Sequence, residues 1–144
     1  MSISRNTTLI VALFTFLIVA DAATQEARGE TYDAGVSPGS NYDQAKFRLW
    51  VPDDLEFVRA VLVLVPGSNG DGRDQVDTGL WRDLAKDEGL ALVGLYMTDK
   101  PHDDMFIEHY VAVGQGSGDA VLQALGVLGN MSGPPELETA PLLL

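Results

Sequence analysis

The feature that most constrains this chain is a run of five branched apolar residues, Val61 to Val65, followed at once by the glycine-rich segment Pro66-Gly67-Ser68-Asn69-Gly70-Asp71-Gly72. A strand made only of such residues is typically buried on both faces, as strands of parallel sheets are. Open α/β sheets bind their ligands at the carboxyl ends of such strands. A glycine-rich turn there can direct several backbone N–H groups toward one point, which stabilises a developing negative charge. We therefore expect an α/β fold with an anion-binding turn after this strand.

Composition narrows the classes of partner. The chain has 144 residues, of which 46% are hydrophobic, so it can form one domain with a core. Its formal net charge is −12, and an acidic surface repels phosphates and anionic lipids, so we expect neither nucleic acid nor a membrane as a partner. The chain contains no cysteine, which excludes disulfides, thiolate nucleophiles and zinc–thiolate sites. We expect no cofactor.

The first 22 residues have the pattern of a secretory signal peptide. Arg5 supplies the positive charge, and the apolar run from Leu9 to Ala20 is short for a membrane span. Ala20-Asp21-Ala22 fits the cleavage pattern, so a mature chain would begin near Ala23. We therefore expect a secreted or periplasmic protein, with an uncleaved membrane anchor as the alternative.

The remaining chain alternates between predicted strands and helices. The polar segment 23–44 predicts a flexible lead-in or an ill-defined hairpin. The alternating residues 46–51 predict a half-buried edge strand, and residues 60–65 and 90–96 predict two buried strands. A short apolar run at 141–144 predicts the start of another strand.

Two helices are predicted between these strands. One is capped by Asp77 or Thr78 and runs to about Glu88, where Gly89 is a suitable terminator. The other begins with Ser117 as its cap and runs to about residue 128, with Gly129-Asn130 as its stop. The side chains expected to face the core are Leu80, Trp81, Leu84 and Ala85 in the first helix, and Val121, Leu122, Leu125 and Leu128 in the second. Such alternation predicts parallel crossovers, and hence a mostly parallel sheet with helices on both faces.

From Phe47 onward the sequence resembles the N-terminal half of secreted α/β-hydrolases of the esterase and polyester-depolymerase-like kind. The matching segments are Val61 to Arg73, the helix around Trp81, Leu90 to Tyr96 and the helix after Ser117. The resemblance implies that residues 45–144 form half of a hydrolase domain. It also implies that residues 140–144 correspond to the strand before the nucleophile elbow, G-x-S-x-G, so that the chain ends before the catalytic serine, acid and base. The implied family chemistry is serine-dependent hydrolysis of a small-molecule or polymeric ester, with no activity expected of this chain alone.

The same resemblance implies a site. Pro66 to Asn69 matches the oxyanion-hole loop, in which the family commonly has His-Gly and this chain has Pro66 in place of the histidine. The implied oxyanion donors are the backbone N–H groups of Ser68 and Asn69. The residues implied at the rim of the substrate cleft are Gly67, Asp71, Arg73, His102 and Asp103.

Two serines of the chain, Ser37 and Ser68, are candidates for the nucleophile itself. Gly35-Val36-Ser37-Pro38-Gly39 matches G-x-S-x-G literally, but the sequence predicts neither a strand before it nor a helix after it. Ser68 itself follows a predicted strand, but the elbow needs a small residue two positions earlier, where Pro66 stands. We therefore prefer the oxyanion turn, and a purely structural turn remains the alternative.

Three patterns suggest a bound ion or nucleotide, and each has a plainer explanation. His102 and His109 with nearby acids suggest a metal site or a catalytic base, but their spacing matches no known motif, so we expect a solvated loop and no metal. Residues 69–73 begin like a calcium loop, with Arg73 at a ligand position and no glutamate at the twelfth. Residues 114–118 resemble a dinucleotide fingerprint, but Asp119 stands where its third glycine belongs.

Two further functions stay open at this point. An exported, non-catalytic binding module or pseudoenzyme remnant would have the same sequence pattern. A nucleotide-binding Rossmann-type domain is a third, weaker hypothesis. A sheet that lacks later strands would also leave an apolar edge open, so we expect self-association.

Overall fold

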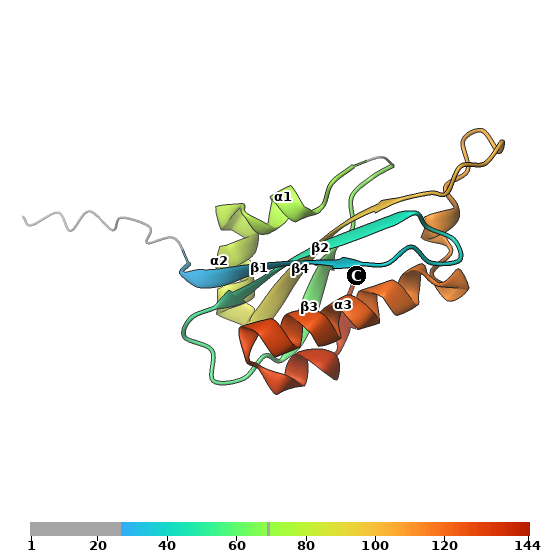
Figure 1. Cartoon of the computed structure of the whole chain (residues 1–144). Coiled ribbons are helices and arrows are strands. Elements are labelled where there is room, and N and C mark those ends of the chain that lie inside the picture. Colours follow the sequence, from blue (N-terminus) through green and yellow to red (C-terminus); the bar gives the residue numbers. More distant parts are fainter. Residues whose placement is uncertain (1–26, 69) are drawn as a thin grey trace, which may run out of the picture.

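The computed structural model describes residues 27–68 and 70–144, so the predicted signal segment 1–22 and Asn69 lie outside the described residues. Five described strands form one sheet in the order β1-β2-β4-β3-β5 (Figure 1). β1 and β2 are antiparallel, as are β2 and β4, whereas β3 pairs in parallel with both β4 and β5. The strands are β1 Gly29–Val36, β2 Gln44–Pro52, β3 Ala60–Leu64, β4 Leu90–Thr98 and β5 Leu142–Leu143.

The sheet is mixed, which corrects the expectation of a mostly parallel one. β1 lies inside the segment 23–44, where no defined strand was predicted, and it covers the outer side of β2. The strand predicted as an edge therefore lies inside the sheet, between β1 and β4. Phe47, Leu49 and Trp50 of β2 are fully buried, because a helix layer covers each face of this strand.

The helices form two layers, one on each face of the sheet (Figure 1). Val61 and Val63 of β3 belong to the core beneath α3, whereas Leu62 and Leu64 pack on the opposite face with α1 and α2. The all-apolar sequence of β3 thus packs on both faces, which confirms the predicted buried strand for residues 60–64. Val65, predicted as its last residue, lies outside β3 and is exposed. The helices are α1 Arg73–Val76, α2 Gly79–Glu88 and α3 Ser117–Ser132, with short 3₁₀ turns η1 His109–Val111, η2 Val113–Gln115 and η3 Pro135–Glu138.

The predicted ends of the helices are partly right. Thr78 precedes α2 and Gly89 ends it with a φ of 70°, the left-handed conformation that glycine adopts at no steric cost. α3 continues past the predicted stop at Gly129 and ends at Gly133, whose φ is 102°. Ser117 is the first residue of α3, not its cap.

The predicted inner faces of the helices are also partly right. Ala85, Leu125 and Leu128 are buried as expected. Leu80, Leu84 and Leu122 are exposed, contrary to the prediction. In α2 only Ala85 is fully buried, and Trp81 packs against the core at its margin. No described helix has the length and apolar character that a bilayer span needs.

A close backbone contact fixes the turn after β3 against β4. The Gly72 N–H donates a hydrogen bond of 2.9 Å to the carbonyl oxygen of Leu95. A Cβ atom built on Gly94 would lie 2.3 Å from the Gly72 carbonyl oxygen, and one built on Gly72 would lie 2.3 Å from that of Leu64. The turn can approach the sheet this closely only because both positions are glycine.

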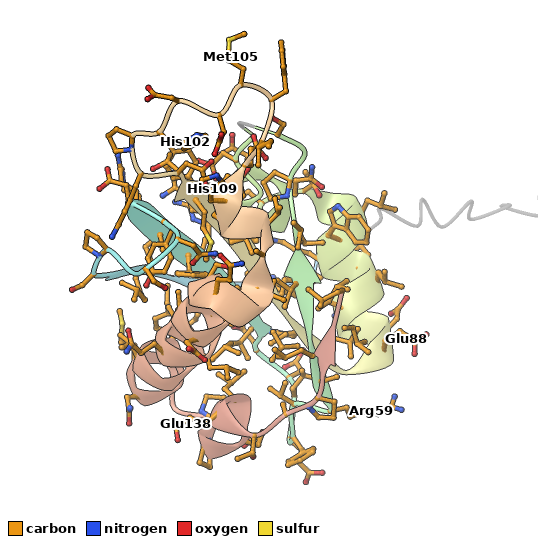
Figure 2. The ribbon with its side chains drawn as sticks, turned by 90° about the vertical axis from the view of Figure 1, so that its right-hand side faces the viewer. Arg59, Glu88, His102, Met105, His109 and Glu138 are labelled. Atoms are coloured by element: carbon orange, nitrogen blue, oxygen red, sulfur yellow. The ribbon has the colours of Figure 1, made fainter. Side chains whose placement is uncertain are left out.

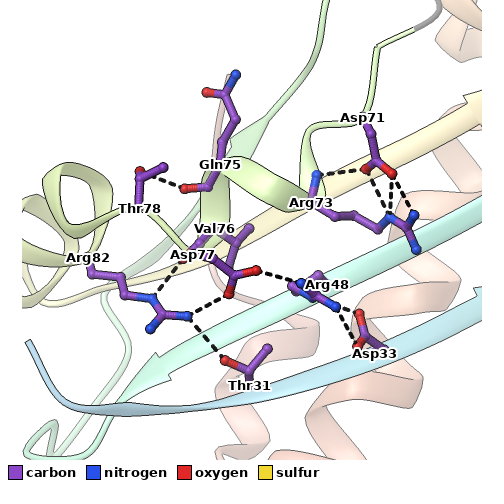
Figure 3. Close-up of polar contacts among 10 residues, drawn as sticks. All are labelled: Thr31, Asp33, Arg48, Asp71, Arg73, Gln75, Val76, Asp77, Thr78 and Arg82. Carbon is purple, nitrogen blue, oxygen red and sulfur yellow. Dashed lines mark hydrogen bonds and ion pairs between the residues drawn. The ribbon is translucent and has the colours of Figure 1, made fainter.

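Charged side chains join β1 and β2 to the α2 layer (Figure 3). Arg48 of β2 forms ion pairs with Asp33 of β1 and with Asp77, which precedes α2. Asp77 also pairs with Arg82 at 2.7 Å, and the Arg82 guanidinium lies 5.4 Å from the centre of the Trp50 ring. This network joins β1, β2 and α2 on one face of the sheet.

Candidate functional site

A cavity of about 760 Å³ opens beside the turn after β3 and the loop after β4. Because β3 and β4 are parallel, their carboxyl ends meet at one edge of the sheet, which is where α/β folds place ligands. Figure 2 shows His102, Met105 and His109 at this end of the molecule, with Arg59, Glu88 and Glu138 toward the other. The lining residues are Ser68, Thr98, Asp99, His102, Phe106, Ile107, Glu108 and Val111.

Glu108 joins the two sides of this cavity. The Ser68 hydroxyl donates a hydrogen bond to Oε1 of Glu108. The Tyr110 hydroxyl donates another, of 2.7 Å, to Oε2 of the same carboxylate. The side chain of Ser68 is thus bonded to a carboxylate, and the turn after β3 is connected to the loop after β4.

Asp99, the first residue after β4, contacts the ring of His102 and the backbone of His109. Its carboxylate accepts the backbone N–H groups of His109 at 2.9 Å and of Tyr110 at 2.8 Å, and it lies 2.9 Å from Nε2 of His102. Burial raises the pKa of Asp99, but these hydrogen bonds outweigh it and hold the pKa below its ordinary value. Asp99 is therefore a fixed anion at the carboxyl end of β4.

The rings of His102 and His109 lie against each other, although other residues of the loop separate them in sequence. Their rings stack with centroids 4.2 Å apart and planes 14° apart. Nε2 of His109 lies 3.1 Å from Oδ2 of Asp104. One ligand atom each of His102, Asp104 and His109 lies within 4.8 Å of the others. The sequence predicted a solvated loop here. The three residues do lie near the surface, but their side chains are partly covered and the loop gathers them into one cluster.

Asp71 and Arg73 form a forked ion pair at the start of α1 (Figure 3). Nε of Arg73 lies 2.9 Å from Oδ1 of Asp71, and the same oxygen accepts the Arg73 backbone N–H at 3.0 Å. The hydrogen bonds from the Arg73 guanidinium hold the pKa of Asp71 below its ordinary value, although burial opposes them. The guanidinium also lies 5.6 Å from the centre of the Tyr96 ring. The Arg73 guanidinium is thus held by Asp71 and lies near the ring of Tyr96.

Only some of the residues predicted for the site line the cavity. Ser68 and His102 line the cavity. The lining does not include the other described residues predicted at the rim, which are Gly67, Asp71, Arg73 and Asp103. The Gly67 carbonyl accepts the Gly70 N–H at 2.9 Å, which closes the turn. The second predicted oxyanion donor, Asn69, lies outside the described residues.

The sequence grouped Asp99 and Glu108 with the two histidines as acids of a possible metal or base site, but did not predict them at the cleft rim, where they line the cavity. It missed the apolar wall formed by Phe106, Ile107 and Val111. The position of Asp99 in the sequence could have indicated its role, because polar residues that directly follow a buried parallel strand lie at the ligand-binding edge of the sheet. Phe106 gave no such signal. Its φ of 68° and its fully exposed side chain depend on the path of the loop.

The competing motifs have clear structural positions. Ser37 directly follows β1, so a strand does precede it, contrary to the prediction, but β2 and not a helix comes next. The arrangement needed for a nucleophile elbow is therefore not present around Ser37. In the segment 114–118, a Cβ on Gly116 would lie 2.4 Å from Oγ of Ser40. This glycine allows the start of α3 to pack against the loop between β1 and β2.

No protein-family model matches the chain, and a search of curated proteins found no match. Among solved structures, the chain is similar to the crystal structure of vibralactone cyclase, with 14% identity and a TM-score of 0.50 over 78% of this chain and 32% of that one. It is also similar to a bacterial heroin esterase, with 17% identity and a TM-score of 0.49 over 85% of this chain and 36% of that one. The chain thus spans about a third of the length of either structure. At this identity the first likeness concerns the fold alone, and it supports an α/β-hydrolase-type fold with a mixed sheet.

Proposed function

We propose that this chain is an exported protein of α/β-hydrolase type, whose chemistry is serine-dependent hydrolysis of a carboxylester or polyester. We also propose that these 144 residues alone do not turn an ester over. The proposal of export depends on the signal-peptide pattern of residues 1–22. The proposed chemistry depends on the cavity at the carboxyl ends of β3 and β4 together with the hydrolase-type fold.

The two-sided lining of this cavity is the observation that carries the proposal. Phe106, Ile107 and Val111 form an apolar wall that suits the acyl or alkyl part of an ester. Ser68 lies on the polar side, in the turn that ends the buried strand β3. An ester combines an apolar chain with a carbonyl group, so both parts of such a molecule find a matching wall.

In this proposal the backbone N–H of Ser68 stabilises the oxyanion of a tetrahedral intermediate, with Asn69 as the second donor. One such donor is worth about 3 kcal/mol of barrier in a complete site. Glu108 opposes this role in the present arrangement, because its carboxylate is bonded to the Ser68 side chain and like charges repel. An oxyanion would bind at Ser68 only after the Glu108 carboxylate turns away.

The proposed inactivity follows from the positions of the two candidate nucleophiles. Ser37 lies between two strands, and the Ser68 hydroxyl donates to a carboxylate. A serine nucleophile needs a base that takes its proton, usually an imidazole held by a third group. His102, held by Asp99, lines the same cavity, but the hydroxyl proton of Ser68 is donated to Glu108, so Ser68 is not activated in this arrangement. An oxyanion turn without an activated nucleophile catalyses nothing.

The first experiment measures hydrolysis of 4-nitrophenyl butyrate by the purified chain and by its Ser68→Ala variant. We expect both to match the uncatalysed background, because Ser68 contributes its backbone N–H and not its hydroxyl. Turnover by the unaltered chain that disappears in Ser68→Ala would overturn the proposed role and make Ser68 the nucleophile.

A second experiment tests the site without turnover. Butyrate, a carboxylate product, is titrated into ¹⁵N-labelled chain while amide resonances are followed. We expect the largest shifts at Gly67 and Ser68, and tighter binding in Glu108→Gln, which removes the opposing charge. Shifts confined to residues far from the cavity, or weaker binding in Glu108→Gln, would contradict the proposed anion site.

A non-catalytic binding module is the second candidate function. The exposed apolar residues Phe106, Ile107 and Val111, which line the cavity, favour it, because such residues are costly to expose and useful for binding. Saturable binding of an ester that is never hydrolysed, by a chain with its natural termini, would favour this function over an enzyme.

Self-association through a sheet edge remains part of the proposal. β5 pairs only with Val61 and Leu62, so the rest of the outer edge of β3 is not covered by a strand among the described residues. Open edges of this kind pair readily with other chains. Sedimentation velocity across a concentration series should show species larger than a monomer, and a monomer at every concentration would contradict this.

A further inference from the structure

We propose that the loop after β4 binds one divalent transition-metal ion through His102, Asp104 and His109. Their ligand atoms, one from each side chain, lie within 4.8 Å of one another. Figure 2 shows His102 and His109 at the same end of the molecule. The spacing of the two histidines in sequence predicted no metal site. The fold nevertheless brings them together, because the loop returns to Asp99 where η1 begins.

Asp104 and His109 already stand at the separation that a metal requires. Nε2 of His109 lies 3.1 Å from Oδ2 of Asp104. Two ligands of tetrahedral zinc, each bonded at about 2.0–2.1 Å, are about 3.3 Å apart. An ion can therefore bind between these two atoms with only a small adjustment.

His102 must move further than the other two ligands. Its ring is stacked on that of His109, and an imidazole nitrogen offers its lone pair in the plane of the ring. Metal binding therefore requires the two parallel rings to turn out of the stack. The side chains of Asp104 and His109 are 59% and 40% exposed, whereas that of His102 is only 20% exposed, so the His102 ring must leave a partly covered position.

Asp99 supplies the support that metal-binding histidines usually have. Nε2 of His102 faces its carboxylate at 2.9 Å, which leaves Nδ1 for the ion. The same carboxylate holds the backbone N–H of His109. Asp99 is therefore a positioning residue that holds Nε2 of His102 and the main chain of His109.

The ligand set selects the class of ion. Two imidazoles and one carboxylate suit Zn²⁺ and neighbouring transition metals, whereas Mg²⁺ and Ca²⁺ prefer oxygen ligands alone. Three protein ligands leave a coordination position open to water. The inference goes beyond the proposed ester chemistry, which uses no metal at any step.

The test uses the chain without a histidine tag, freed of metal with a chelator. Zn²⁺ is titrated by calorimetry, and Co²⁺ binding is followed by its visible absorption. We expect one equivalent to bind, with affinity at least tenfold lower in His102→Ala and His109→Ala. Asp99→Asn should weaken binding by about tenfold to a hundredfold, as loss of such supporting groups does in other metal sites.

Asp104→Asn and Asp103→Asn form a matched pair, since each removes one negative charge from the same loop. Only Asp104→Asn should weaken binding. Equal losses in both would mean general attraction of a cation to an acidic loop, and would overturn the site. Unchanged affinity in His109→Ala would overturn it too.

Far-UV circular dichroism will show whether each variant folds. If a variant does not fold, a measurement on the unaltered chain still tests the site. The ring resonances of His102 and His109 should shift together when one equivalent of Zn²⁺ is added. Rings that do not respond would overturn the proposal. These readouts report metal binding alone, so their result is independent of whether the ester proposal stands.

Discussion

Replacing Gly94 by alanine tests whether the turn after β3 is held by backbone contact with β4. The added Cβ would lie 2.3 Å from the Gly72 carbonyl oxygen and 2.7 Å from Cα of Arg73. Both neighbours are backbone atoms, so no flexible side chain can give way. The turn that bears Ser68 would have to move instead.

The size of the effect follows from these distances. The Gly72 oxygen must retreat by about 1 Å to reach ordinary contact distance, which strains the 2.9 Å hydrogen bond from Gly72 N–H to the Leu95 oxygen. Overpacking costs about 1–3 kcal/mol, and a lost hydrogen bond costs about 0.5–1.5 kcal/mol. We therefore expect Gly94→Ala to lower the free energy of unfolding by about 3 kcal/mol.

Urea denaturation followed by circular dichroism measures this loss, which should lower the midpoint by about 1–3 M for a protein of this size. Gly79→Ala is the matched control, because a Cβ there meets nothing within 4 Å. Gly79 is also the first residue of α2, so alanine should stabilise the chain by up to about 1 kcal/mol. Equal midpoints for the two variants would refute the reasoning.

Three further predictions concern stability. Leu128→Ala should lower the free energy of unfolding by about 2–5 kcal/mol in urea denaturation, because Leu128 is fully buried. Leu122→Ala should lower it by less than about 0.5 kcal/mol, because Leu122 is 56% exposed. Equal losses would mean that α3 is rotated from its described position. The pKa of Asp71 is lowered by Arg73, so this carboxylate stabilises the fold above its ordinary pKa of 3.8, and the contribution is lost as pH falls through the lower folded value. Asp71→Asn should therefore show a shallower decline of melting temperature below that pH, and a profile parallel to that of the unaltered chain would contradict the pairing. Phe106 has a φ of 68°, so Phe106→Gly should be more stable than Phe106→Ala by about 1 kcal/mol in thermal melts, and the reverse order would place the residue in another conformation.

The sequence predicted the centre of the sheet better than its margin. β3 was evident because every residue from Val61 onward is apolar, and Gly89 marked the end of α2 because glycine is suited to a left-handed terminator. β1 was missed because its sequence contains glycine and acidic residues, which are depleted in strands. It forms through pairing with β2 over its whole length, which is a tertiary effect.

The site was predictable to a similar degree. Ser68 and His102 could be assigned to one edge of the sheet, because each follows a predicted buried strand. The contact of Ser68 with Glu108 and that of His109 with Asp104 could not, because both depend on how the loop after β4 folds back onto Asp99. Phe106 in a left-handed conformation lies on that path, and a spacing rule does not anticipate it.

The strands lead all the cavity-lining loops to one end of the molecule, while Arg59 and Glu88 lie toward the opposite end (Figure 2). The Arg59 guanidinium bonds only to the Glu88 carbonyl oxygen among the side-chain hydrogen bonds described for it. A fluorophore, a biotin or a solid support attached at this far end would therefore leave the cavity facing the solution. Immobilised in that orientation, the chain could be presented to insoluble polymer films as readily as to dissolved molecules.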